Sequence, residues 1–172
     1  HKETYDTLFL TGLRIGELCA LRWCDLDLER KKLSVRGSFS TASRKVTSPK
    51  TKTSIRTIDL PNRLVEELKQ RYERKKKLDG FNDLYYVFGD IAVTWPGTFR
   101  YRFNNDLKNV DVKHITIHGF RHSHASYLLS NPMISESLVA ERLGHSIDML
   151  RSTYAHIYEK RRTALVEYIE KL

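Results

Sequence analysis

A histidine and an arginine three residues apart have side chains that together suit a phosphate. His118 and Arg121 follow the apolar run 115–117, at the start of a segment in which Ala125 and Leu128 have helical spacing. Residues three apart on a helix project from the same face. A guanidinium can hold two phosphate oxygens, and an imidazole can exchange a proton near neutral pH. The pair favours a phosphate site, and histidines that cap or pack helices are the alternative.

A zinc site is another interpretation of this helix, because His118 and His122 have the i, i+4 spacing of zinc-binding histidines. Gly119 stands where the zinc-protease motif has its glutamate, and no third ligand is obvious, although His114 and His124 are nearby. We therefore expect no metal at these histidines.

A further histidine and a tyrosine lie downstream, among signals that end one helix and begin the next. Gly144 marks a helix end just before His145, and Ser146 caps the following helix, on which we expect Tyr154. Tyr158 lies four residues after Tyr154. On helical spacing alone, Tyr154 could therefore be a core aromatic residue.

Two upstream segments complete a set of four motifs in a fixed order. Residues 12–18 (GLRIGEL) place Arg14 at the junction between two expected helices. Residues 49–58 (PKTKTSIRTI) form a basic, strand-like segment with a turn. Together with the segments that hold His118 and Tyr154, they resemble the tyrosine recombinase family, in particular the integrases of phages and integrative elements. The resemblance covers nearly the whole chain.

The resemblance implies a role for each matching residue. It assigns Arg14 and Arg121 as the paired phosphate-binding arginines, His118 as the histidine of the His-x-x-Arg motif, Lys52 as the lysine of a hairpin turn, His145 as the second histidine, and Tyr154 as the nucleophile, with Tyr158 as the alternative. Glu17 matches an acidic position that supports other site residues without reacting. Lys52 is chosen over Lys50 because it keeps the usual four-residue distance to Arg56.

Several of these residues have a simpler interpretation. Arg14 could form a solvated i, i+3 ion pair with Glu17. Lys50, Lys52 and Arg56 on one hairpin could all contact phosphates, in which case Lys52 has no acid role. We expect Lys50 and Arg56 to bind DNA in either case.

The implied reaction is phosphoryl transfer through a covalent protein–DNA link. Tyr154 attacks the phosphorus while His118 helps to manage its proton, which gives a 3′-phosphotyrosyl bond, and Lys52 protonates the leaving 5′ oxygen. The two guanidiniums and His145 neutralise the developing charge, where losing one well-placed donor costs about 2.7 to 4 kcal/mol. Rejoining by a 5′-hydroxyl then needs no ATP, and we expect no metal or other cofactor.

The elements that must position these residues are helices and short strands. Spacing and capping signals predict helices over 5–9, 15–21, 64–72, 98–108 and from 118 onward. Strand-like composition marks 33–39, 44–48, 54–60 and the short segment 85–88. We expect an α+β fold that is mainly α-helical with a small antiparallel β-sheet, which the resemblance also implies.

Length and composition fit one soluble globular domain over residues 1–172. Thirty Lys and Arg against 21 Asp and Glu give a net charge of +9 and a pI near 9.6, which favours a nucleic-acid partner, although charge can also serve solubility. The sequence has no apolar run long enough to cross a bilayer, so we expect no membrane role. We interpret Cys19 and Cys24 as reduced core residues, with a disulfide or metal binding as minor alternatives.

The resemblance also implies partners and a setting. We expect double-stranded DNA attachment sites as the substrate, a homotetramer on DNA in the full-length protein, and accessory DNA-bending or directionality factors. The reaction would integrate or excise a mobile element in the cytoplasm of a bacterial or phage-infected cell, at the nucleoid. The family's amino-terminal DNA-binding domains do not fit before His1, so we expect a fragment of a longer integrase. A type IB topoisomerase-like enzyme and a non-catalytic DNA-binding module are the alternatives.

The last segment, 157–172, has an apolar helical face made of Ala164, Leu165, Ile169 and Leu172. Such a face needs a surface to pack on. In the family a tail of this kind often packs on a neighbouring protomer, and packing on its own domain is the alternative.

Overall fold

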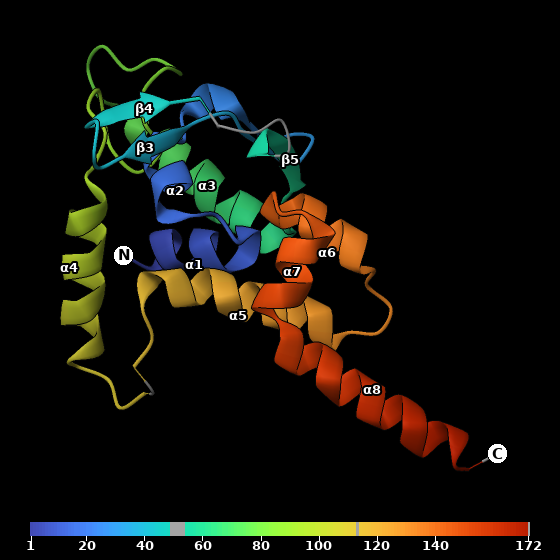
Figure 1. Cartoon of the computed structure of the whole chain (residues 1–172). Coiled ribbons are helices and arrows are strands. Elements are labelled where there is room, and N and C mark those ends of the chain that lie inside the picture. Colours follow the sequence, from blue (N-terminus) through green and yellow to red (C-terminus); the bar gives the residue numbers. More distant parts are fainter. Residues whose placement is uncertain (49–53, 113, 172) are drawn as a thin grey trace.

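Helices from both halves of the chain pack around α1 (Lys2–Thr11) in the computed structural model, which describes residues 1–48, 54–112 and 114–171 (Figure 1). Both α3 (Asn62–Lys75) and α5 (Ile117–Ser130) contact α1. The other helical elements are α2 (Ile15–Ala20), the 3-10 helix η1 (Trp23–Asp25), α4 (Pro96–Leu107), α6 (Glu136–Leu143), α7 (Ile147–Thr153) and α8 (Ala155–Ile169). The mainly helical α+β class is confirmed.

The strands within these described ranges form two small antiparallel sheets, where we expected one. The first sheet has the order β1 (Leu26–Asp27), β2 (Lys32–Val35), β5 (Arg56–Asp59), and the second pairs β3 (Ser38–Ser40) with β4 (Lys45–Thr47). Leu33 of β2 lies opposite Ile58 of β5, and both side chains are buried. This inward alternation is the period-two pattern by which strands are recognised in a sequence.

The expected strand 33–39 is divided because its two halves have different neighbours. β2 pairs with β5, whereas β3 pairs with β4 and contacts α2. Gly16 of α2 permits this contact, since a Cβ there would stand 2.6 Å from Ser38 Oγ and 2.8 Å from Phe39 O. The change of partner is a long-range property, and local composition carries no signal for it.

The expectation of a short strand over 85–88 is wrong. Tyr86 forms only an isolated bridge with Arg22, and the amide of Val87 donates to Leu21 O at 2.8 Å. The chain then turns, with the amide of Gly89 donating to Tyr86 O. Val87 is fully buried, so burial in the core, and not strand pairing, explains the apolar character of this segment.

Two hydrophobic clusters meet at α5, which contributes residues to both. Ile117 at its start belongs to the larger cluster, which unites α1–α4 with the first sheet. The smaller cluster consists of Ala125, Leu129, Val139, Ala140, Leu143, Leu150 and Tyr154. Each fully buried valine or leucine side chain stabilises the fold by about 1.5 to 3 kcal/mol. The residues of α5 between Ile117 and Ala125 therefore lie where the two clusters are joined.

The two cysteines have different environments. Cys19 is buried in the larger cluster as expected, and burial raises the pKa of its thiol to about 12. Cys24 is exposed, so the expectation that it is a core residue is wrong. It lies in η1, where the neighbouring Trp23 takes the buried position. Both cysteines are free.

The carboxyl-terminal helix α8 extends away from the rest of the domain (Figure 1). Its first turns contact α5 and α7, where Ile157 and Tyr158 pack against the smaller cluster. Further along, Leu165 is 58% exposed and Ile169 is 55% exposed. Like the other helices of the described ranges, α8 is not both long and apolar enough to span a membrane.

Gly12 at the end of α1 provides a test of how tightly this junction is packed. Its φ is +69°, and an added Cβ would stand 2.6 Å from His124 Cδ2 and 2.9 Å from Leu143 Cδ2. Gly12→Ala is therefore expected to lower the free energy of unfolding by about 2 kcal/mol or more, through backbone strain and overpacking. Urea denaturation measures this change.

Gly97→Ala is the matched control for this substitution. A Cβ at Gly97 meets no atom within 4 Å, and the residue lies in the first turn of α4. We expect a change of less than about 1 kcal/mol, towards higher stability, because alanine favours helix. Equal effects of the two substitutions would contradict the steric explanation.

Candidate active site

The buried guanidinium of Arg121 connects α5 to the ends of two other helices. Its Nη1 donates to Gly12 O at 2.5 Å and its Nη2 to Leu143 O at 2.7 Å, at the carboxyl ends of α1 and α6. Helix carboxyl ends carry partial negative charge and suit a cation. Burial and then the charge of Arg14 lower the pKa of Arg121 to about 9, so the guanidinium stays charged at neutral pH.

His145 lies directly beside this guanidinium. It follows Gly144, which ends α6 in the left-handed conformation as the sequence predicts. Arg121 Nη2 lies 2.8 Å from His145 Nε2, and since a guanidinium only donates, the imidazole proton lies on Nδ1. Burial and the charge of Arg121 lower the pKa of His145 to about 4. Nδ1 is thus a buried donor, and no acceptor for it lies within the described ranges.

Glu17 holds the second arginine of the candidate site. The backbone amide of Arg14 and its Nη1 donate to the two carboxylate oxygens of Glu17, at 2.9 and 3.0 Å. Burial alone would raise the pKa of Glu17, but its bonds and charge interactions with Arg56 and then Arg14 hold that pKa below the ordinary value. The side chain of Arg14 remains 36% exposed, unlike that of Arg121. The Arg14–Glu17 pair, for which a solvated contact was the simpler alternative, is therefore half-buried and fixed.

Arg56, which we expected to contact DNA, is buried instead. Its side chain is only 3% exposed, with Nη1 and Nη2 donating to Glu17 at 3.1 and 2.9 Å. Its Nε donates to Arg142 O at 2.7 Å. Alternation along β5 directs Arg56 and Ile58 inward, so this guanidinium needs internal partners and is withdrawn from solvent. Arg56 positions Glu17 in this arrangement, and its contact with DNA stays a prediction.

The two lysines expected on the hairpin, Lys50 and Lys52, lie outside the described residues. Their roles as a DNA contact and as the acid for the leaving oxygen therefore stay predictions.

Tyr154 lies between two helices and not within one, contrary to our expectation. α7 begins after its Ser146 cap as expected but ends at Thr153, and Tyr154 precedes α8 with φ −114° and ψ 28°. The residue is 2% exposed in the smaller cluster. Burial raises the pKa of Tyr154, and the charge of Arg121 opposes this only in part. The phenol is therefore protonated at neutral pH.

The hydroxyl of Tyr154 is in contact with His122, a residue that the sequence analysis weighed only as a metal ligand. Tyr154 Oη lies 3.2 Å from His122 Nδ1. The rings of His122 and His118 pack edge to face, with centroids 4.6 Å apart. Burial, and then the charges of His122, Arg121 and Arg14, lower the pKa of His118. The i, i+4 spacing of the two histidines was the sequence signal for this contact, and the tyrosine partner was not visible.

The structure therefore brings five of the predicted site residues together. They are Arg14, His118, Arg121, His145 and Tyr154. Arg14 comes from the start of α2, and its charge acts on the pKa of Arg121, His118 and His145. Within the described ranges, no group of three or more His, Cys, Asp or Glu side chains is arranged to hold a metal ion. His124 contacts Arg142 Nε at 3.1 Å, and burial lowers its pKa to about 4.

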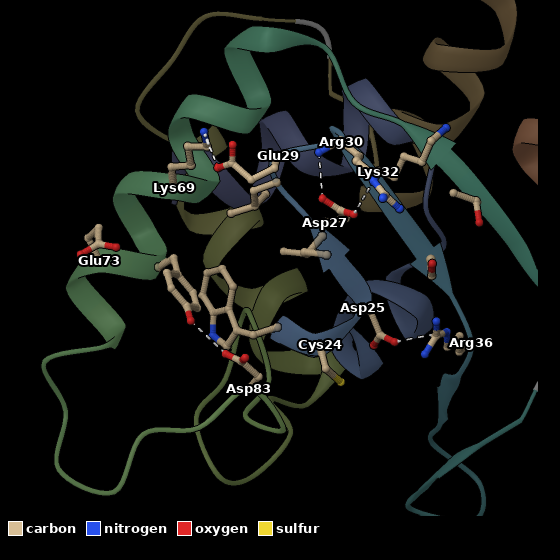
Figure 2. Close-up of a pocket in the computed structure, with 16 residues that line it drawn as sticks. Cys24, Asp25, Asp27, Glu29, Arg30, Lys32, Arg36, Lys69, Glu73 and Asp83 are labelled. Carbon is tan, nitrogen blue, oxygen red and sulfur yellow. Dashed lines mark hydrogen bonds and ion pairs between the residues drawn. The ribbon is translucent and has the colours of Figure 1, made fainter.

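An open cavity of about 900 Å³, lined by η1, β1, β2 and α3, contains none of the predicted site residues (Figure 2). Its carboxylates are paired in several places, with Glu29 at 3.1 Å from Lys69 and Asp25 at 3.8 Å from Arg36. Acidic and basic side chains thus offset each other there. This surface does not have the concentrated positive charge of the Arg14 and Arg121 region.

The buried Glu17 gives a prediction on stability and its pH dependence. Glu17→Gln leaves Arg56 without its charged partner and should lower the free energy of unfolding at pH 7 by about 3 kcal/mol. A carboxylate with a lowered pKa stabilises the fold above its unfolded pKa, and the contribution is lost as the pH falls through the folded pKa. The difference between the two proteins should therefore shrink below about pH 4.3.

Urea denaturation at pH 7 and at pH 3.5 tests this expectation. Glu29→Gln is the control, because Glu29 is 88% exposed in its pair with Lys69 and should change stability by less than about 1 kcal/mol. A difference between wild type and Glu17→Gln that does not depend on pH would contradict the assigned charge state.

Comparison with known proteins places this arrangement in a family. The model of the phage integrase family matches residues 2–161. The ICEBs1 integrase of Bacillus subtilis (strain 168) is 31% identical over 99% of this chain and 49% of its own length. A XerC-like tyrosine recombinase of Caldanaerobacter subterraneus subsp. tengcongensis is 32% identical, with the same two coverages of 99% and 49%. The chain thus spans about half the length of these curated relatives.

Solved structures show the same fold. A structure of the Tn1549 transposon integrase (residues 82–397) in complex with circular intermediate DNA has a TM-score of 0.72 and 25% identity, and covers 98% of this chain and 59% of that one. The XerA recombinase has a TM-score of 0.68 and 22% identity, with coverages of 94% and 62%. The chain belongs to the phage integrase family and has the fold of tyrosine recombinase catalytic domains.

Proposed function

We propose that this chain is the catalytic part of a site-specific DNA recombinase that cleaves and rejoins strands through a 3′-phosphotyrosyl link to Tyr154. The reaction serves the integration or excision of a mobile element. The observation that carries the proposal is the convergence of Arg14, Arg121, His118, His145 and Tyr154 from four separate parts of the fold. Family membership supports this proposal. The names of the relatives favour recombination over the activity of a topoisomerase or the role of a non-catalytic module.

Charge neutralisation at phosphorus is the main catalytic task of these residues. Arg121 is fixed by backbone carbonyls, and within the described ranges its contacts use three of its five N–H groups. Arg14 is partly exposed and can approach a bound strand. The unpartnered Nδ1 donor of His145 suits a phosphate oxygen. A single well-placed donor is worth about 2.7 to 4 kcal/mol in such a transition state, so three donors supply a large part of the barrier reduction.

The chemical step exchanges one phosphoester for another. The Tyr154 oxygen forms a bond to phosphorus and gives its proton to a histidine of the site, the bond from phosphorus to the 5′ oxygen breaks, and Lys52 supplies a proton to that leaving oxygen. Rejoining is the reverse reaction, in which a 5′-hydroxyl attacks the phosphotyrosine. Because the ester energy is retained throughout, rejoining requires no ATP. The cationic side chains take the role that a metal ion has in other phosphoryl transfers, which is to neutralise the charge at phosphorus.

Double-stranded attachment-site DNA is the proposed substrate. The net charge of +9 supports a polyphosphate partner, and the Tn1549 integrase structure named above is a complex with DNA. Such a substrate places the protein at the nucleoid, in the cytoplasm of a bacterial or phage-infected cell, with accessory DNA-bending or directionality factors as further partners. The candidate active-site residues bind phosphates, which carry no base sequence, so recognition of the DNA sequence requires other contacts.

Tyr154→Phe tests the proposed nucleophile on a nicked suicide substrate, from which the cleaved strand escapes. Wild type should form a covalent protein–DNA adduct visible by denaturing electrophoresis, and Tyr154→Phe should form none because it lacks the attacking oxygen. Tyr158→Phe is the matched control, since Tyr158 lies one helical turn further on and should leave adduct formation intact. An adduct that persists in Tyr154→Phe would move the nucleophile elsewhere.

We further propose that the protein assembles as a homotetramer on DNA, with α8 packing on a neighbouring protomer. The first part of α8 is held in its own domain, where Arg161 donates to Leu129 O, but Leu165, Val166 and Ile169 are exposed. An apolar groove of about 500 Å³ lies between α1, α5 and α6, and this is a candidate acceptor for those side chains. Leu172, which the sequence places on the same face, lies outside the described residues.

Leu165→Glu tests this mode of assembly. The charge should weaken association of protomers on DNA by about tenfold or more, seen as lower mass in light scattering, because a buried carboxylate at the contact is unpaired. Thr163→Glu adds the same residue at an exposed polar position of the same helix and should have no effect. Unchanged assembly of Leu165→Glu would favour a free tail.

A further inference from the structure

We infer that His122 is a catalytic residue that accepts the proton of Tyr154 as the phenol oxygen attacks the phosphorus. The inference rests on the proposed function and assigns a role that the family resemblance did not give to any residue at this position. It also changes the role expected of His118, which was to manage that proton.

The geometry points to His122 because its contact with the nucleophile is direct. Tyr154 Oη lies 3.2 Å from His122 Nδ1, and the two ring centroids are 5.8 Å apart at 61°. In the part of the chain that the structure describes, His122 Nδ1 is the hydrogen-bond partner of the Tyr154 hydroxyl. The phenol donates to Nδ1 when the imidazole is neutral with its own proton on Nε2.

Tyr154 and His122 differ in burial, and this difference suits transfer of a proton from the first to the second. Tyr154 is 2% exposed and belongs to the same buried cluster as Leu129 and Leu150. His122 is exposed, one residue after the buried Arg121 on α5. A proton that leaves the buried phenol therefore passes to a side chain that can exchange it with solvent. In an apolar environment, transfer to water without such an acceptor would be slow.

The neighbouring His118 is placed for a different task. Burial, and then the charges of His122 and of the two guanidiniums of the phosphate site, Arg121 and Arg14, lower its pKa. The ring of His118 meets the ring of His122 edge to face at 4.6 Å, so two imidazolium charges would repel each other. His118 therefore stays neutral and donates to a phosphate oxygen, while His122 carries the transferred proton.

Every proton is accounted for in both cleavage and rejoining. In cleavage, the bond between the Tyr154 oxygen and phosphorus forms, the phenol proton moves to His122 Nδ1, and the 5′ oxygen leaves with a proton from Lys52. In rejoining, the tyrosine oxygen becomes the leaving group, and the His122 imidazolium returns the proton to it. One residue thus serves as base in the first step and acid in the second.

The test measures single-turnover cleavage of the nicked duplex by His122→Ala and His122→Asn. Asparagine presents an amide oxygen near the position of Nδ1, so it can hold the phenol but cannot take its proton. Both variants should slow cleavage by about 10²- to 10³-fold, and added imidazole should partly restore only His122→Ala. The control is His114→Ala, at an exposed histidine before α5, which should cleave at the wild-type rate.

A modified tyrosine and a modified DNA substrate distinguish proton transfer from a structural effect. A fluorotyrosine at position 154, whose phenol is more acidic, should recover much of the rate lost in His122→Ala. A 5′-phosphorothiolate substrate, whose leaving group needs no acid, should rescue Lys52→Ala and not His122→Ala. Thermal unfolding of the His122 variants should match wild type, because the side chain is exposed.

Several results would overturn the inference while leaving the proposed function intact. They are a His122→Ala rate within twofold of wild type, full activity of His122→Asn, or no recovery by fluorotyrosine, each with Tyr154→Phe still inactive. Adduct formation by Tyr154→Phe would instead overturn the proposed function itself, so the two failures are distinguishable.

Discussion

The buried guanidinium of Arg121 is held by backbone carbonyls at the ends of two helices, and the position of His145 in the site depends on this interaction. A buried cation without partners is costly, and here the carboxyl ends of α1 and α6 supply the compensation through Gly12 O and Leu143 O. The same bonds fix the end of α6, so His145, two residues further on, lies against the guanidinium. Because carbonyls carry no net charge, Arg121 keeps its positive charge for a phosphate.

The second arginine is fixed by a different device, a single buried carboxylate. Glu17 accepts from both Arg14 and Arg56, and Arg56 continues to Arg142 O. One negative charge therefore serves two guanidiniums, and the region retains a surplus of positive charge. The outcome is one rigid and buried arginine and one partly exposed arginine, a combination in which Arg121 orients a phosphate and Arg14 can follow the strand as it binds.

The sequence predicts a feature of this structure when the residues that determine the feature are close to it in the chain. The end of α6 at Gly144 and the cap of α7 at Ser146 were predicted because both signals lie within a few residues of the boundary they set. Arg56 was assigned to DNA because its burial depends on Glu17, 39 positions away in the chain. The His122 contact was missed for the same reason, since its partner Tyr154 comes from another helix end. Chemistry-bearing residues were thus found by type and order, and their partners were not.

The break between α7 and α8 links the position of the buried tyrosine to the direction of α8. Tyr154 is the residue between Thr153, which ends α7, and Ala155, which begins α8, and its φ and ψ are not helical. Ile157 and Tyr158 at the start of α8 pack on the same cluster that holds its ring. The direction of α8 and the position of the phenol are therefore linked through one junction. A protomer that binds the exposed end of α8 would act on the placement of the nucleophile, so assembly and cleavage would be coupled without any contact to the reacting atoms.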